Sequence, residues 1–152
     1  MIQLLSLLKK LLKGDIHIDV DEGVFTYKGV RVVTIPVPAV VLTALEVANM
    51  FGDAGPILLE RLGEGVGASI KETMGWASGE ETLKEFPNIA RAGGFGKVWV
   101  KENHLVMENL PVSLEDNVLL AYMRGFLRGL CIELEDVQTS GNILRAKFKT
   151  VC

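Results

Sequence analysis

Residues that often carry chemistry are few in this sequence and are spread along it. His17 lies on an alternating stretch that predicts a strand, and His104 lies at a polar turn. Neither belongs to a Ser-His-Asp order or to a Cys/His spacing that holds zinc. Asp15, Asp19 and Asp21 share the polar face with His17, but ligands in line along one strand converge poorly on a metal ion. We therefore expect no metal and no other cofactor, and catalysis is the lesser alternative.

The two cysteines, Cys131 and Cys152, form no C-x-x-C motif. Two thiols fit a reducing compartment best, so we expect a cytoplasmic protein. Cys131 follows an apolar helix, where a thiol is more often a small buried hydrophobic group than a nucleophile. The thiols therefore predict no chemistry.

Glycine recurs one helical turn apart in two predicted helices. Gly125 and Gly129 stand in "AYMRGFLRGL", and Gly63 and Gly67 stand in "LLERLGEGVGASI". Each glycine costs about 1 kcal/mol relative to alanine in a helix interior, so something must offset that loss. Small residues on one face let two backbones approach closely, and the added contacts can compensate. We predict that the two helices cross at these four glycines.

The hydrophobic periodicity predicts the elements that carry these glycines. Short strands are expected between residues 15 and 35, followed by helices at about 38–51 and 55–74 and a short polar helix within 79–94. Two strands joined by residues 102–104, a helix at about 115–130 and two strands around 141–142 complete the order. This order predicts an α+β fold in which an antiparallel sheet packs against helices. The 152 residues suggest a single domain.

The chain is apolar for its charge content, and the surplus must be buried somewhere. Apolar residues make up 49% of it, and the mean hydropathy is +0.31. The helix at 38–51 is apolar almost all round, which indicates burial on two sides or against another subunit. We predict a homodimer whose interface includes Val41, Leu45 and Met50.

Residues 1–13 predict an amphipathic helix with lysines on its polar face. It is too short to span a bilayer, and no small-residue cleavage site of a signal peptide follows it. A membrane-surface helix is one interpretation, and packing on its own domain or on a twin subunit is the favoured one.

A site for a small apolar molecule is the function that the helices favour. Such a site needs apolar and aromatic walls, which two helices and a strand could supply. The predicted ligand-binding residues are Leu62, Val66, Met107, Tyr122 and Phe126. Ordinary core packing is the alternative for each of them.

Basic residues offer two further alternatives. Arg124 and Arg128 could receive a carboxylate or phosphate, although a solvated stripe is the simpler interpretation. Two strands could present a basic face with an aromatic side chain to nucleic acid: Lys97, Trp99, Lys101, Arg145, Lys147 and Lys149. The net charge of −3 disfavours that partner, and exposed lysines also protect sheet edges from aggregation.

Three segments in order resemble the 4-vinyl reductase domain family over about residues 30–150: "LLERLGEGVGASI", "FPNIARAGGFGKVWV" and "AYMRGFLRGL". The resemblance implies a small-molecule-binding α+β domain, similar in fold to the small TRAPP subunits, that dimerises through helices. Some members of the family sense aromatic effectors and bind zinc through a Glu-x-x-Cys-x-x-x-Gly-x-x-x-Cys pattern. Anchored on Gly141, this sequence has Leu134, Val137 and Arg145 at those positions, so the zinc site is expected to be absent.

The sequence therefore predicts a non-catalytic homodimeric domain that binds or senses a small apolar, aromatic or lipid-like ligand. The alternative is a protein-interaction module without a ligand. An enzyme and a nucleic-acid binder are the lesser possibilities.

Overall fold

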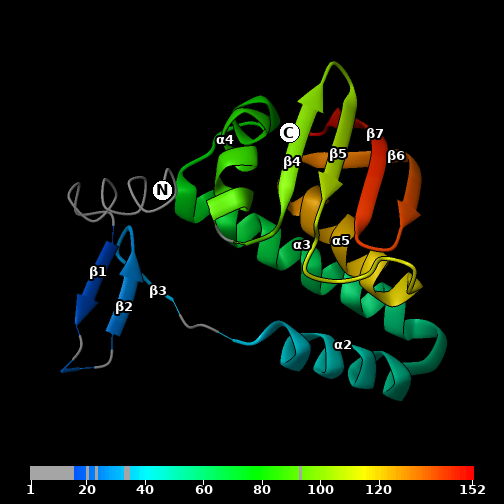
Figure 1. Cartoon of the computed structure of the whole chain (residues 1–152), viewed down its shortest axis with the longest axis horizontal. Helices are drawn as coiled ribbons and strands as arrows, with labels where there is room; N and C mark the ends of the chain where they lie inside the picture. Colours follow the sequence, from blue (N-terminus) through cyan, green and yellow to red (C-terminus); the bar gives the residue numbers. More distant parts are fainter. Residues whose placement is uncertain (1–15, 20, 23, 33–34, 93) are drawn as a thin grey trace. The chain divides into compact units, whose positions relative to one another are not determined.

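The computed structural model of the chain describes residues 16–19, 21–22, 24–32, 35–92 and 94–152 (Figure 1). The chain divides into two compact units, one up to Ile35 and one from Pro36 to Cys152. The predicted helix at 1–13 lies outside the described residues. The organisation of residues 1–152 as a single domain stays a prediction.

The first unit contains a three-stranded antiparallel sheet. Its strands are β1 (Ile16–Asp19), β2 (Val24–Tyr27) and β3 (Val30–Arg31), paired in that order. Lys28 and Gly29 both have positive φ, 50° and 79°, and they form the two-residue turn between β2 and β3. Turns of this kind match the twist of the flanking strands.

The second unit combines helices with a four-stranded antiparallel sheet. Its elements are α2 (Val37–Phe51), the 3₁₀ turn η1 (Gly52–Ala54), α3 (Gly55–Met74), α4 (Gly79–Ala92), β4 (Lys97–Lys101), β5 (His104–Glu108), α5 (Asn117–Gly129), β6 (Ile132–Ser140) and β7 (Ile143–Thr150). The strands pair in the order β4-β5-β7-β6. The predicted α+β fold, with helices packed against an antiparallel sheet, is confirmed.

Local sequence signals place the helix ends. Pro36 precedes α2 and Pro38 lies in its first turn, where the missing amide proton costs nothing. Asp116 caps α5 by accepting a hydrogen bond of 2.7 Å from the amide of Val118. Gly75 ends α3 with a φ of 71°, a conformation that glycine adopts without strain.

The core lies between the sheet and α5. Along β7, Leu144, Ala146 and Phe148 are buried, whereas the alternating basic residues are exposed on the other face. In Figure 1, α3 and α5 lie against one face of the four-stranded sheet. Phe126 of α5 packs between Phe95 and Phe86, with ring centroids 5.7 and 6.1 Å away. The sheet therefore has a covered inner face and an open, charged outer face.

The cysteines correct the interpretation made from the sequence. Cys131 and Cys152 form a disulfide, because the start of β6 and the residues after β7 meet at one end of the sheet. The amide of Val151 donates a hydrogen bond of 3.1 Å to the carbonyl of Cys131, and Lys71 Nζ lies 3.0 Å from Cys131 Sγ. The interpretation of Cys131 and Cys152 as two free thiols was wrong. The expectation of a reducing compartment rested on that interpretation and loses its support.

Candidate functional site

The four glycines singled out in the sequence lie where α3 crosses α5. A methyl group at Gly63 would collide with the carbonyl oxygen of Tyr122 and lie 2.8 Å from the amide nitrogen of Phe126. One at Gly129 would collide with the carbonyl oxygen of Glu64 and lie 2.7 Å from the nitrogen of Ala68. Gly67 and Gly125 meet backbone in the same way, at Phe126 and Glu60 respectively. Each helix therefore presents glycine where the backbone of the other touches it.

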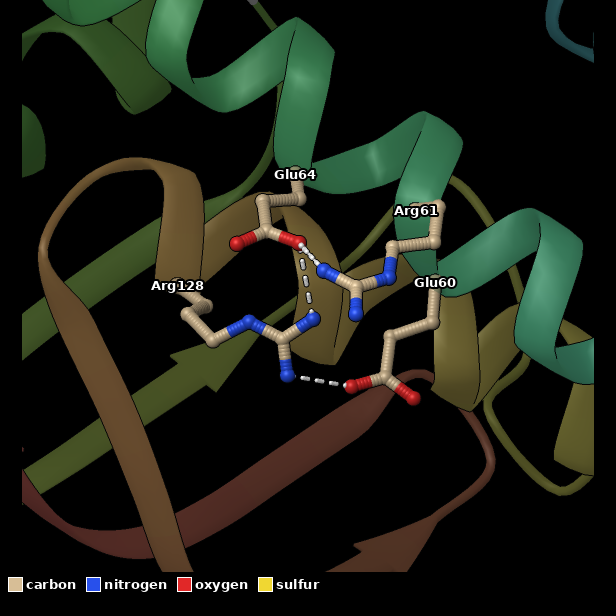
Figure 2. A network of polar contacts seen from close by, with 4 residues as sticks. All are labelled: Glu60, Arg61, Glu64 and Arg128. Carbon is tan, nitrogen blue, oxygen red and sulfur yellow. Dashed lines mark hydrogen bonds and ion pairs between the residues drawn. The ribbon is translucent and has the colours of Figure 1, made fainter.

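A charged network spans the same crossing (Figure 2). Arg128 of α5 donates to Glu60 Oε1 at 2.6 Å and to Glu64 Oε2 at 2.9 Å, and Arg61 Nη1 lies 3.0 Å from the same Glu64 oxygen. Arg128 and its two partners are each about one-third exposed. Arg128 is therefore an inter-helix ion-pairing residue whose carboxylate partners come from α3, a role that the sequence did not specify.

Arg128→Met is expected to lower the melting temperature, and the loss should shrink as the pH falls from about 7 to about 3. The hydrogen bond from Arg128 holds the pKa of Glu64 below its ordinary value. A carboxyl group with a lowered folded pKa stabilises the fold above its unfolded pKa, and that stabilisation disappears as the pH falls through the folded value. Thermal melts of both proteins at the two pH values measure the effect. Arg124→Met, an exposed change on the same helix, is the control, and equal losses at both pH values would contradict the prediction.

The structure separates the five predicted ligand-binding residues into two groups. Met107 and Phe126 are buried in the core between sheet and helices. Tyr122 packs partly buried against that core, and burial raises the pKa of its phenol. Leu62 is exposed on α3, and Val66 lies at the boundary, because it packs on the core and also lines a surface concavity. Of the five side chains, only those of Leu62 and Val66 line the concavity beside α3.

The concavity beside α3 has a volume of about 380 Å³. Its described lining residues follow one stripe of the helix: Arg61, Leu62, Gly65, Val66, Ser69 and Ile70. Beyond the helix's own backbone, a methyl group at Gly65 would have no described atom within 4 Å. Packing therefore explains Gly63 and Gly67 but not Gly65, and the missing side chain at Gly65 deepens the stripe between apolar neighbours.

Sequence reasoning identified Leu62 and Val66 but missed Gly65 and Ser69. A signal was present, because three glycines alternate along "GEGVG" and residues two apart on a helix point to different faces. If Gly63 and Gly67 face α5, Gly65 must face elsewhere. A third glycine outside the crossing was therefore the feature that marked this stripe.

A second feature is the apolar surface of α2 and the first turns of α3. Ala48 is the buried residue of α2, whereas Leu42 is 64% exposed and Met50 is 81% exposed. Ile57 at the start of α3 is 65% exposed. Of the predicted interface residues, Val41 and Leu45 are half-buried and Met50 is exposed. Single exposed hydrophobic residues are common on protein surfaces, but here several large apolar side chains are exposed on two consecutive helices.

The stretch Val37–Met74 has the length and hydropathy of a membrane span, with 6% of its most apolar window buried. It is not one helix, however, because α2 ends at Gly52, whose φ is 54°, and η1 separates it from α3. The 15 residues of α2 are fewer than the roughly 20 that a helix needs to cross a bilayer. The length of the combined stretch therefore reflects two consecutive helices.

Side chains that ligate metals are dispersed over the described part of the chain. Among the residues that the structure describes, no three His, Cys, Asp or Glu side chains lie close enough together to hold a metal ion. Leu134 and Val137, at two positions of the family's zinc pattern, pack against the core. The α3 concavity is lined mainly by aliphatic groups, a lining suited to binding an apolar molecule.

Two solved structures are similar to this chain. The first is the phenol-responsive sensory domain of the transcription activator PoxR, in a crystal structure with phenol; it has a TM-score of 0.58 and 15% sequence identity, and covers 91% of this chain and 87% of that chain. The second is a trafficking protein particle complex subunit 3 from Naegleria fowleri covalently bound to palmitic acid, with a TM-score of 0.42, 17% identity, and 73% and 93% covered. No protein-family model matches the sequence, and the search of curated proteins finds no match. The likeness to the PoxR domain shows the fold.

Proposed function

We propose that this chain is a non-catalytic domain that binds or senses a small apolar or aromatic molecule beside α3. The concavity at Gly65 carries the proposal. It combines a helical glycine that packing does not require with aliphatic walls from Leu62, Val66 and Ile70. The PoxR domain, which shares the fold, is a phenol-responsive sensory domain. Ser69 supplies a hydroxyl that could orient a polar group of the ligand.

We also propose that the domain acts as a homodimer through α2 and the start of α3. Leu42, Met50 and Ile57 would leave water on association, and such burial is the main driving force for subunit contact. A two-fold contact would place the same apolar surface on both subunits.

A protein-interaction module without a small ligand is the second candidate, and the packed core favours it. Leu105, Met107, Leu127 and Ile132 are each fully buried, so side chains fill the space between sheet and helices. In this case the apolar surface of α2 and α3 would carry the function alone.

Native mass spectrometry of the purified protein tests the proposal. The expected result is a mass of twice 16.6 kDa per assembly, with a retained small molecule. Gly65→Leu should fill the concavity and remove the retained molecule, while the dimer persists and the melting temperature does not fall, because leucine has a higher helix propensity than glycine. Wild-type protein measured in parallel is the control.

Each outcome separates the candidates. The interaction module would be favoured by two results together: a dimer that retains no small molecule, and added phenol that leaves the backbone amide shifts near Gly65 and Ser69 unchanged. A mass of 16.6 kDa at micromolar protein concentration would contradict the dimer.

A further inference from the structure

The outer face of the four-stranded sheet contains a hollow that no part of the proposed function uses. It has a volume of about 650 Å³ and lies over β5, β7 and β6. Its charged and polar lining residues are His104, Asp136, Gln138, Arg145 and Lys147, and its apolar ones include Val106 and Val137. Because α3 and α5 lie on the other face of the sheet in Figure 1, the hollow is separate from the concavity beside α3.

A β-bulge forms one wall of this hollow. Glu135 pairs with Lys147 and Gln138 pairs with Arg145, so two residues of β6 stand opposite Ala146 alone. Asp136, in the bulge, has a φ of 48°, which is a strained conformation for a residue other than glycine. Bulges bend a strand and redirect side chains next to functional sites. Here the bulge directs the carboxylate of Asp136 to Lys147, at 2.7 Å.

Ion pairing leaves one cation of the hollow unused. Lys147 is paired with Asp136, and neighbouring Lys149 is paired with Glu133 at 2.9 Å and with Glu135 at 3.1 Å. Lys147 also holds the pKa of Asp136 below its ordinary value, so this carboxylate is charged at neutral pH. Arg145 is exposed and makes no ion pair within the described part of the chain. Two cations, Arg145 and Lys147, and one carboxylate, Asp136, line the hollow, which leaves one positive charge.

We propose that this hollow binds a small organic monoanion, an aliphatic or aromatic carboxylate, with Arg145 as its counter-ion. A guanidinium can bind both oxygens of a carboxylate, and the aliphatic side chain of Val106 suits the organic part. One net positive charge matches one negative charge. A dianion such as phosphate would carry a second charge close to Asp136 and Glu135, which repel it.

The test uses sodium octanoate, 1-octanol and inorganic phosphate as probes, followed through backbone amide shifts of the whole chain. Octanoate should shift the amides of Val106, Gln138 and Arg145 saturably. The affinities of 1-octanol and of phosphate for the hollow should each be lower than that of octanoate by about tenfold or more. Arg145→Met should weaken octanoate by about tenfold, and Arg145→Lys should weaken it less, because lysine keeps the charge but not the two-pronged geometry.

Two variants serve as controls. Lys149→Met removes an ion-paired cation from the same face of β7 and should leave the octanoate affinity unchanged. Gly65→Leu fills the α3 concavity and should leave the shifts around Arg145 unchanged, so a failure of either site is seen separately. Phosphate binding as tight as octanoate, or an equal loss in Arg145→Met and Lys149→Met, would overturn the proposal.

Discussion

Gly125→Ala is expected to destabilise the protein by about 3 kcal/mol, whereas Gly65→Ala should stabilise it by about 1 kcal/mol. A methyl group at Gly125 collides with the carbonyl of Glu60 and lies 3.0 Å from the Cα of that residue, so a backbone rather than a flexible side chain must move. At Gly65 the methyl group faces open space and only improves the helix propensity. Melting temperatures should fall by roughly 6–12 °C and rise by roughly 2–4 °C respectively.

The two substitutions are matched, because both replace a helical glycine with alanine. Differential scanning calorimetry reads both effects under one condition. A loss of stability in Gly65→Ala would contradict the open surroundings of Gly65 on α3. An unchanged melting temperature for Gly125→Ala would show that α3 and α5 do not cross at this residue.

The second large effect is expected on removal of the disulfide. Cys131 and Cys152 are 21 residues apart, and closing a loop of that length stabilises a fold by about 3 kcal/mol, mainly by restricting the unfolded chain. Cys152→Ser should therefore lower the free energy of unfolding by about that amount. Denaturant titrations without reductant measure the difference.

Reductant provides the control for this prediction. Dithiothreitol should lower the stability of the wild-type protein to that of Cys152→Ser and leave the variant unchanged. Two reactive thiols per chain in the unreduced wild-type protein would show that the cysteines are not bonded to each other.

Most of the fold was predictable because hydrophobic periodicity reports which side of an element is buried. The alternation of Leu144, Ala146 and Phe148 with basic residues predicted a half-buried strand, and β7 has this pattern. The start of α2 is marked by Pro36 and Pro38, and the start of α5 by Asp116, one of two possible capping residues beside Ser113; these side chains act within one turn of their own backbone. Signals of this kind are local, so one sequence is sufficient to read them.

The site was less predictable because its properties depend on which residues meet across the fold. Periodicity marks Phe126 and Val66 equally as apolar helix residues, although one is in the core and the other also borders a concavity. The polar line of α5 showed that Arg128 faces outward from the core but not that Glu60 and Glu64 lie opposite it. The same limit applies to the cysteines, because pairing depends on where two chain segments end in space.

The contact between α3 and α5 also determines which parts of the domain can move on binding. The carbonyl groups of Glu60, Glu64, Tyr122 and Phe126 occupy the positions where Cβ atoms would stand on the facing helix. Sliding or rotating one helix would drive these carbonyls into neighbouring side chains, so the pair is a single rigid body. α2 has one buried residue, Ala48, and joins α3 through Gly52. The backbone of Ala48 also lies where a methyl group at Gly55 would stand, so α2 is held against the start of α3, and a movement of α3 would carry α2 with it.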